Sequence, residues 1–506
     1  MRRSPCLAVA VVLVTGACGD NQYGGPDGLP DGPGRFDSPS DFDHAAAGCV
    51  PDAMAGLARE GIFHFQATYS DGYSGAGAAR LDDLGGWEYG GALAGGDATR
   101  AWIDDDELFL YRDLGEDRSR SLLLCGRVGD ELRGAYAFCT PEDCYLASVV
   151  AVGIEPMDEA PAQGLTLLGE LGNPGWGTGI TVNVRVANDL AYLARYQDGL
   201  RIVDVSDPAR PVDVGHGPCE HPDDNEIYND VKLMESGGRR YAIMGSNRVG
   251  AVVWDVTTPA APAIVSHFGT ADLMEPANVH TIFLDGGKAY LGAVGRGLEI
   301  WDLANPAAPV RLSGFFPANA PDGAFLHDLF VEGDRAYLNF WNAGMVIADV
   351  STPSAPRPVG TFVDYGDSSS HSSWVTTVGN RRIAAHGDEE WGSHVRLVDV
   401  TEGSAGFLRE VGAFETRPEV SAHNLMAAGT EVFAAYYQDG VRILDISDPA
   451  APRQTAWFNT WPGYDRRYGK SFFEGTVGID LDLARGRIYV ADSHRGLLIL
   501  QRPASN

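Results

Sequence analysis

Residues 201–211 read RIVDVSDPARP, and variants of this line recur through the second half of the chain. Each copy begins with an apolar run rich in β-branched residues, which suits a buried β-strand. An Asp, one more apolar residue and a turn follow; Asp and Ser side chains bond nearby amides there, and Pro cannot continue a ladder. The other copies are VVWDVTTPAAP (252–262), EIWDLANPAAP (299–309), VIADVSTPSAP (346–356), RLVDVTEGSAG (396–406), RILDISDPAAP (442–452) and the truncated LLILQRP (497–503).

The spacing of these copies is that of a repeat protein. Successive aspartates lie 46 to 51 residues apart, which is the period of a propeller blade. Other strand-like runs surround each copy, such as NVHTIFL (278–284), AYLARYQDGL (191–200) and PVDVG (211–215). Seven units of four strands predict an all-β fold with a seven-bladed β-propeller over residues 163–503, in which neighbouring sheets bury one another's faces. We expect a structural role in the turns for Asp204, Asp255, Asp302, Asp349, Asp399 and Asp445.

The last unit ends at LLILQRPASN without a fourth strand. A matching segment lies at the other end of the repeats, where GLTLLGELG (164–172) resembles PVDVGHG (211–217) and precedes the first unit. We therefore predict that residues 164–172 join the final blade and close the ring. Closure removes two sheet edges that otherwise invite aggregation.

The units resemble the LVIVD repeat family. The resemblance rests on GLRIVDVSDPARP (199–211) and GVRILDISDPAAP (440–452) with the preceding AYLA-type strand, and it covers about two thirds of the chain. The fifth unit departs from the pattern with TEGSAG (401–406) in place of the Pro turn, and the seventh has Gln501 in place of the Asp. Membership in this family implies an exported, surface-located propeller of bacteria or archaea, and it implies no reaction.

The composition excludes a nucleic-acid partner. The chain has 38 Lys and Arg against 69 Asp and Glu, a formal net charge of -31 and a pI near 4.6. Phosphate binding requires clustered basic residues, which this balance does not favour. We interpret the acidity as a soluble, self-repelling surface. Acidic loops that hold calcium are the alternative, although no D-x-[DN]-x-[DN]-G loop is present.

Residues 1–18 (MRRSPCLAVAVVLVTGAC) have a basic start, an apolar core and a small-residue site before Cys18. The apolar stretch is too short to cross a bilayer, so it indicates an export signal. It resembles a bacterial lipoprotein signal, which implies a lipid on Cys18 and a membrane anchor, although Thr15 stands where such signals usually have Leu. An ordinary secretory signal is the alternative. Gly19 precedes Asp20, which favours the outer membrane or cell surface over the inner membrane.

Two further segments precede the propeller. Residues 19–48 are rich in Gly, Pro and Asp, which predicts a disordered tether with an end-to-end distance of about 30 Å. Residues 49–160 carry short alternating runs separated by turn signals, which predict an antiparallel meander forming a small barrel or a sandwich. The runs are 61–69, 98–103, 107–112, 121–128, 132–139 and 145–154.

The cysteines of this first domain indicate disulfides. An even number in an exported domain suggests two bonds, and three connectivities are open. We favour Cys139–Cys144 across a hairpin loop and Cys49–Cys125 at the start of the domain. Cys219, in the propeller, is left over, and we expect an unreactive thiol there.

Histidines recur at corresponding places in successive units. Three of them lie ten residues before the aromatic residue of the second strand, and a fourth is shifted by two, which keeps it on the same strand face. The set is His280, His327, His423 and the shifted His371, with Asn229 and Asp230 at the equivalent place in the second unit. If innermost strands begin here, the imidazoles converge on one mouth of the channel and suit a divalent metal such as Zn, Cu or Fe. The polar stretches 220–226 and 386–394 are expected nearby.

A structural role is the alternative for these residues, because equivalent polar side chains in repeats often bond the backbone of the next blade. A propeller fold does not by itself specify a function. Our first hypothesis is a lipid-anchored binding or interaction module that uses one propeller face for a protein, glycan or small ligand. The second is a metal-dependent enzyme with its site at the histidine-lined mouth, although no catalytic residue can be assigned. The third is a structural component of the envelope.

Overall fold

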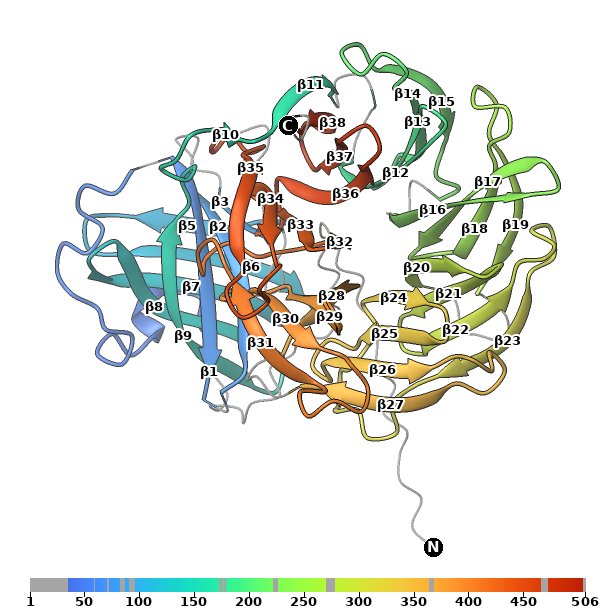
Figure 1. The fold of residues 1–506 in the computed structure, drawn as a ribbon. Coiled ribbons are helices and arrows are strands. Elements are labelled where there is room, and N and C mark those ends of the chain that lie inside the picture. The colour runs from blue at the N-terminus through green and yellow to red at the C-terminus, as the bar shows by residue number, and fades with distance from the viewer. Residues whose placement is uncertain are drawn as a thin grey trace, which may run out of the picture. The chain divides into compact units, whose positions relative to one another are not determined.

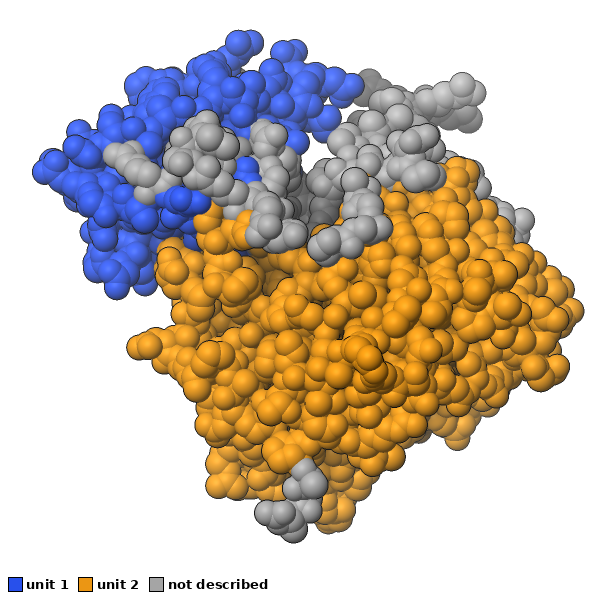
Figure 2. All heavy atoms as spheres, turned by 90° about the horizontal axis from the view of Figure 1, so that it is seen from above, with its two compact units in different colours: residues 1–151, 470–472 blue, residues 152–469, 473–506 orange. Residues whose placement is uncertain are grey.

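The computed structural model describes residues 35–58, 60–70, 72–81, 87–90, 96–172, 176, 179–221, 226–269, 278–363, 368–465 and 472–503. The expected signal peptide, Cys18 and the first part of the tether lie outside these residues. The described chain is all-β apart from a short 3-10 helix, η1 (Pro39–Asp41), and none of it forms a helix long and apolar enough to span a membrane. It divides into two compact units, residues 1–151 with 470–472 and residues 152–469 with 473–506 (Figure 2).

The first unit contains one antiparallel sheet with the strand order β4-β3-β2-β1-β9-β8-β7-β6-β5 (Figure 1). The small antiparallel β domain is therefore confirmed, as one antiparallel sheet that curves into a half-barrel. The strands are β1 (Gly61–Tyr69), β2 (Ser74–Leu81), β3 (Trp87–Gly90), β4 (Gly96–Asp97), β5 (Arg100–Ile103), β6 (Leu108–Gly115), β7 (Arg118–Val128), β8 (Glu131–Cys139) and β9 (Cys144–Gly153).

Both faces of this sheet are covered, which explains the unbroken apolar run in β7. Leu122 and Leu124 belong to one core cluster, whereas Leu123 between them belongs to another, because successive side chains in a strand point to opposite faces. The second cluster includes Phe42, which is 6% exposed. Residues 35–48 thus cover one face of the sheet, and the boundary of the expected tether at residue 48 is too late. The reason is that a few aromatic side chains supply enough apolar surface to order a Gly- and Asp-rich segment.

The two favoured disulfides are present. Cys49 and Cys125 are bonded with Cα atoms 4.5 Å apart, and Cys139 and Cys144 are bonded with Cα atoms 4.0 Å apart. The second pair closes the β8–β9 hairpin, in which the two cysteines are directly opposite each other. Cys219 is a buried free thiol, and burial raises its pKa, so it remains protonated.

The second unit is a propeller of seven sheets, numbered here as blades 1 to 7 (Figure 1). Blades 1 and 2 are β12 (Thr181–Ala187), β13 (Leu190–Arg195), β14 (Gly199–Asp204), β15 (Val212–Gly217), and β16 (Tyr228–Ser236), β17 (Arg239–Ser246), β18 (Gly250–Asp255), β19 (Ala263–Phe268). Blades 3 and 4 are β20 (Val279–Asp285), β21 (Lys288–Ala293), β22 (Gly297–Asp302), β23 (Val310–Phe315), and β24 (Asp328–Glu332), β25 (Arg335–Asn339), β26 (Met345–Asp349), β27 (Arg357–Phe362).

The remaining blades follow the same order. Blades 5 and 6 are β28 (Ser370–Val378), β29 (Arg381–Asp388), β30 (Val395–Asp399), β31 (Arg409–Phe414), and β32 (Leu425–Ala428), β33 (Glu431–Tyr436), β34 (Gly440–Asp445), β35 (Arg453–Phe458). Blade 7 is β36 (Thr476–Asp482), β37 (Arg487–Asp492) and β38 (Gly496–Gln501), completed by β11 (Thr166–Leu171). The short strand β10 (Ala162–Gln163) extends blade 6 by pairing with β35.

The ring is closed as the sequence predicts. Strand β11 pairs with β38, from Thr166 opposite Gln501 to Leu171 opposite Leu497, so the first strand of the unit completes the last blade. The innermost strands β12, β16, β20, β24, β28, β32 and β36 each contact the next, and β36 contacts β12. Apolar clusters join neighbouring blades; one contains Tyr290 and Ile300 of blade 3 with Leu338 of blade 4. Each buried side chain of this size contributes about 1.5–3 kcal/mol, and only the neighbouring blade makes that burial possible.

The repeated aspartates lie in the turns between the third and fourth strands. The Oδ1 atom of Asp204 accepts a hydrogen bond of 2.9 Å from the amide of Ser206, two residues further on. The equivalent aspartates 255, 302, 349, 399 and 445 each make the same contact. In the seventh blade, Nε2 of Gln501 donates instead to the carbonyls of Arg485 and Gly486. These carboxylates are thus occupied in their own turns, far apart from one another in sequence.

Candidate metal centre at the propeller axis

A β-bulge leaves one residue near the start of the innermost strand without a ladder partner in five of the blades. In blade 5, Ser370 pairs with Asp388 and Ser372 with Gly387, so His371 between them has no partner in the ladder. A bulge of this kind redirects the side chain of the extra residue. The residues at this position are Val182, Asn229, His280, His371 and Val477 in blades 1, 2, 3, 5 and 7.

Blades 4 and 6 place a histidine at the same point by a different route. The amide of His327 donates to the carbonyl of Asn339 at 2.8 Å, directly ahead of β24. The amide of His423 makes the same contact with the carbonyl of Ala435 at 2.8 Å, ahead of β32. All seven blades therefore present one equivalent residue at this end of the channel.

The four histidines of blades 3 to 6 form a continuous row. Ring centroids lie 4.2 Å apart for His280 and His327, 4.2 Å for His327 and His371, and 4.3 Å for His371 and His423. The imidazoles that the sequence analysis groups together are thus in mutual contact at the axis, and all four are buried.

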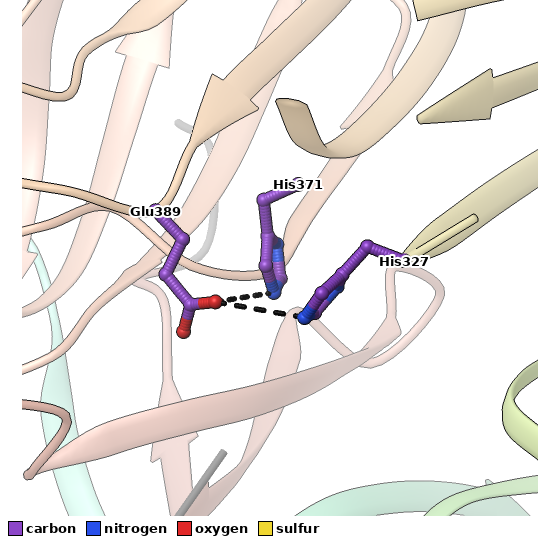
Figure 3. A group of neighbouring side chains, drawn as sticks. All are labelled: His327, His371 and Glu389. Atoms are coloured by element: carbon purple, nitrogen blue, oxygen red, sulfur yellow. Dashed lines mark ion pairs between the residues drawn. The ribbon is translucent and has the colours of Figure 1, made fainter. Parts of the chain in front are cut away.

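A buried carboxylate faces three of these rings. Glu389 lies one residue past β29 and is fully buried. Its Oε2 atom is 3.4 Å from Nε2 of His371 and 3.7 Å from Nε2 of His327, and its Oε1 atom is 3.6 Å from Nε2 of His423 (Figure 3 shows the first two pairs). The hydroxyl of Tyr437, at the corresponding place in blade 6, donates a hydrogen bond to Oε1.

Several polar atoms of this group have no hydrogen bond. Within the described residues, neither ring nitrogen of His327 or His371 has a hydrogen-bond partner, and neither does Oε2 of Glu389. Each unsatisfied buried group costs about 1–3 kcal/mol, so natural folds rarely retain several together without a function. One ligand atom each from His327, His371 and Glu389 lies within 4.8 Å of the others, a spacing that suits a metal ion.

Burial keeps the whole group neutral. It lowers the pKa of His280 to about 4 and that of His423 to about 3, and it lowers the pKa of His327 and His371 well below 6.5, helped by the neighbouring imidazoles. The pKa of Glu389 is raised well above 4.5, mainly by burial. Neutral imidazole is the form that binds metals, whereas the carboxyl group must lose a proton to do so.

The outer hydrogen bonds fix which nitrogen faces the site. Nδ1 of His423 lies 2.6 Å from the carbonyl of Val477, which can only accept, so Nδ1 carries the proton and Nε2 has a free lone pair. Nδ2 of Asn229 lies 2.9 Å from Nδ1 of His280 and donates to it, so the proton of His280 is on Nε2. His423 is therefore arranged as a ligand and His280 as a hydrogen-bond donor.

Asp230, grouped with these residues by sequence, occupies a different layer. Its Oδ1 accepts from Nδ2 of Asn183 at 2.7 Å, its Oδ2 accepts from the amide of Ile282 at 2.8 Å, and both oxygens contact Nζ of Lys232. Burial raises the pKa of Asp230, but the charges of Lys232 and Arg185 outweigh it and the net shift is downward. Asp230 therefore joins blades 1, 2 and 3 and is not a ligand of the axial group.

Two members of the site were not singled out by sequence. Glu389 lies in the polar stretch 386–394, which was expected near the histidines, but nothing there distinguishes it from its acidic neighbours. Tyr437 is one residue past β33, which is the same position in the next blade that Glu389 has in its own. Aligning the residues that directly follow the second strand of each blade would find both. In the other stretch, 220–226, the Glu226 carboxylate accepts from Oγ of Ser246 and from the amide of His221, both at 2.8 Å, while residues 222–225 lie outside the described part.

Comparison with known families identifies the repeats. The LVIVD repeat matches residues 178–216, 326–364 and 421–460. The chain contains LVIVD repeats. The three LVIVD matches coincide with blades 1, 4 and 6, and two of them include axial histidines, His327 and His423. No curated protein matches the chain.

Several solved structures match the LVIVD-containing chain at low sequence identity. Raptor from Chaetomium thermophilum is 11% identical with a TM-score of 0.48, over 67% of this chain and 29% of Raptor. U3-55K is 9% identical with a TM-score of 0.46, over 67% of this chain and 98% of U3-55K. The computationally designed Ika8 protein is 8% identical with a TM-score of 0.42, over 79% of this chain and 95% of Ika8.

Proposed function

We propose that this protein is an exported LVIVD-type propeller, anchored to the bacterial envelope by a lipid on Cys18, that binds a first-row transition-metal ion at its axis. The observation that carries the proposal is the group His327, His371 and Glu389, whose ligand atoms lie within 4.8 Å of one another. Their buried nitrogens and Oε2 have no hydrogen-bond partner in the described part of the chain. His423 is the further ligand, through Nε2.

The distances in the group support an ion between these atoms. Two ligands at about 2.1 Å from one ion and at a tetrahedral angle lie about 3.4 Å apart. The Glu389 oxygens lie 3.4 to 3.7 Å from the three histidine nitrogens, so only small movements would be required. Imidazole suits Zn, Cu, Fe and Ni, and two histidines with one carboxylate also suit non-haem Fe(II).

The structural alternative accounts for fewer of the contacts. Side chains that merely join blades bond the neighbouring backbone, as Asp230 does with the amide of Ile282. His327 and His371 make no such bond among the described residues. A bound cation explains why these two rings remain buried beside a carboxyl group.

The propeller face that carries the histidines is the candidate face for binding a partner. The histidines lie at the start of the innermost strands, on the face where one blade connects to the next. Several of these connections are long, as between Phe458 and Thr476, whereas turns at the opposite end are as short as Asn188–Asp189. We assign a protein or glycan partner, if one is bound, to the face with the long connections, because binding residues concentrate on such loops.

Export and anchoring rest on the sequence of residues 1–18 and on the two disulfides. Disulfides form in oxidising compartments such as the periplasm or the cell surface. Palmitate labelling of the expressed chain, with Cys18→Ser as the matched variant, tests the anchor. We expect label and membrane association for the native chain and neither for the variant. Unlabelled native chain would point to the ordinary secretory signal.

Metal content tests the central part of the proposal. The purified chain, stripped with a chelator and dialysed, is titrated with Co²⁺ or Zn²⁺ and analysed for bound metal. We expect one ion per chain, at least a hundredfold weaker binding for the double variant His327→Ala/His371→Ala, and unchanged binding for His267→Ala. His267 is a suitable control because it pairs with Glu220 away from the axial group. No bound ion at any stoichiometry would refute the metal site.

A further inference from the structure

The seven axial positions carry different kinds of side chain. Side chains of one kind are grouped in neighbouring blades of the ring. In order from blade 1 to blade 7 they are Val182, Asn229, His280, His327, His371, His423 and Val477. The residues placed to ligate come from blades 4, 5 and 6, and Glu389 also comes from blade 5. Blades 7 and 1, which follow in the ring, supply two buried valines, 0% and 1% exposed.

All four protein ligands therefore come from three consecutive blades of the ring, blades 4 to 6. Structural metal sites are closed by protein donors on all sides, whereas sites that act on a substrate retain an open position. An ion held by Nε2 of three histidines and by Glu389 has no side-chain donor at the axial positions of blades 7 and 1. A six-coordinate ion keeps coordination positions beyond four protein donors, as Fe(II) does in a site of two histidines and one carboxylate.

We infer that the ion bound by His327, His371, His423 and Glu389 keeps a coordination position open toward Val182 and Val477, and that a small exogenous anion occupies it. This inference rests on the proposed function. The anionic class follows from charge, because a divalent ion with three neutral imidazoles and one carboxylate has a net charge of +1 in a buried site.

A donor for such a ligand is already present. His280 contacts His327 with ring centroids 4.2 Å apart, and Asn229 fixes its proton on Nε2. Its ring is therefore a neutral hydrogen-bond donor beside the ligand set, without being part of it. A metal with an exchangeable position and an adjacent donor is the arrangement that the hypothesis of a metal-dependent enzyme requires.

The test uses the full chain loaded with one Co²⁺ and titrated with azide, monitored by the visible d–d bands of cobalt. We expect a spectral change that saturates at one azide per cobalt. Val182→His supplies a fourth imidazole to the open position, so it should retain one Co²⁺ and bind azide at least tenfold more weakly. Val182→Ile, which adds volume without a donor, should retain cobalt and the azide response.

The outcomes separate the two proposals. Stoichiometric cobalt with no azide response in the native chain overturns the open position and leaves metal binding intact. Absence of cobalt overturns the proposed function itself. If Val182→His does not fold, as judged by circular dichroism, Val477→His makes the same test from blade 7, and an undiminished azide response there counts against the inference.

Discussion

Oε2 of Glu389 lies 3.4 Å from Nε2 of His371, although the two residues reach the propeller axis from different strands of one blade. His371 is the bulged residue of β28, and Glu389 follows the last residue of β29. The first pair of that ladder, Ser370 opposite Asp388, brings them together, and the amide of Glu389 donates to the carbonyl of Ser369 at 3.1 Å. A single hairpin therefore brings the backbone of both residues together, and Tyr437 of blade 6 adds a hydrogen bond to the carboxyl group.

Replacing Glu389 by Gln is expected to stabilise the metal-free protein and abolish metal binding. Burial raises the pKa of Glu389 well above 4.5, whereas the unfolded chain ionises near 4.5. Above that pH the folded state binds the extra proton, so the residue lowers stability through neutral pH. Glu389→Gln should therefore raise the free energy of unfolding of the metal-free protein at pH 7, measured by urea unfolding.

Glu235→Gln, which changes a 69% exposed carboxylate paired with Arg240, serves as the control for that gain. It should leave both stability and metal affinity close to those of the native chain. A Glu389→Gln protein that is less stable than the native chain at pH 7 would show that the carboxyl group is ionised and satisfied without a metal, contrary to the site described above.

The axial histidines predict a loss of stability in acid. Burial lowers the pKa of His280 to about 4 and that of His423 to about 3, while the unfolded residues titrate near 6.5. Between about pH 6.5 and 4 the unfolded state binds more protons, so stability falls as the pH falls. Protonation of His280 alone lowers the free energy of unfolding by on the order of 3 kcal/mol across this range. Urea unfolding of the metal-free chain from pH 7.5 to 4.5 measures the slope, and His280→Asn should flatten it. A slope unaffected by that substitution would contradict the buried, neutral ring.

Much of the fold follows from sequence because the repeat encodes it several times. The Asp-containing turn, the apolar strand before it and the missing fourth strand of the last unit are each visible in the residues, and closure by β11 follows from counting strands. The histidine row is visible for the same reason: equivalent positions in a closed ring must converge. His371 fits despite its shift because β28 (Ser370–Val378) is longer than β20 (Val279–Asp285), so the bulge keeps its place.

Features that depend on packing rather than on the repeat were not predictable. Glu389 is distinguished from Glu390 only by the register of one hairpin. Strand β2 (Ser74–Leu81) was not expected because SGAGAARL has few large apolar residues, and the reason lies in its neighbour. A Cβ atom at Gly77 would come within 2.5 Å of the Phe65 ring, so small residues are needed where that ring packs. Which side chain fills a gap is decided by its partner strand, and single-strand patterns do not contain that information.

The stability of the folded protein is expected to depend strongly on Asp230. Replacing it by Ala removes acceptors for the amide of Ile282 and for Nδ2 of Asn183 and leaves Lys232 buried without its counter-charge. Breaking one partner of a buried pair costs about 3–5 kcal/mol, and removing both charges restores much of it. We expect Asp230→Ala to be severely destabilised and Asp230→Ala/Lys232→Met to recover, in urea unfolding. Equal stability of the single and double variants would show that the pair is not coupled.

Closure of the ring is testable by a single substitution. A Cβ atom at Gly169 in β11 would lie 2.3 Å from the carbonyl oxygen of Pro208 in the turn of blade 1, so Gly169→Val must push β11 away from that turn. Because β11 is the outer strand of blade 7, the displacement weakens its ladder with β38, and overpacking of this kind costs about 1–3 kcal/mol. Leu167→Val, at a 37% exposed position of the same strand, should be nearly neutral.

Deleting residues 163–172 should go further and abolish the single cooperative unfolding transition, because β38 then becomes an unpaired sheet edge. Melting that is unchanged by the deletion would mean that the ring does not depend on its first strand.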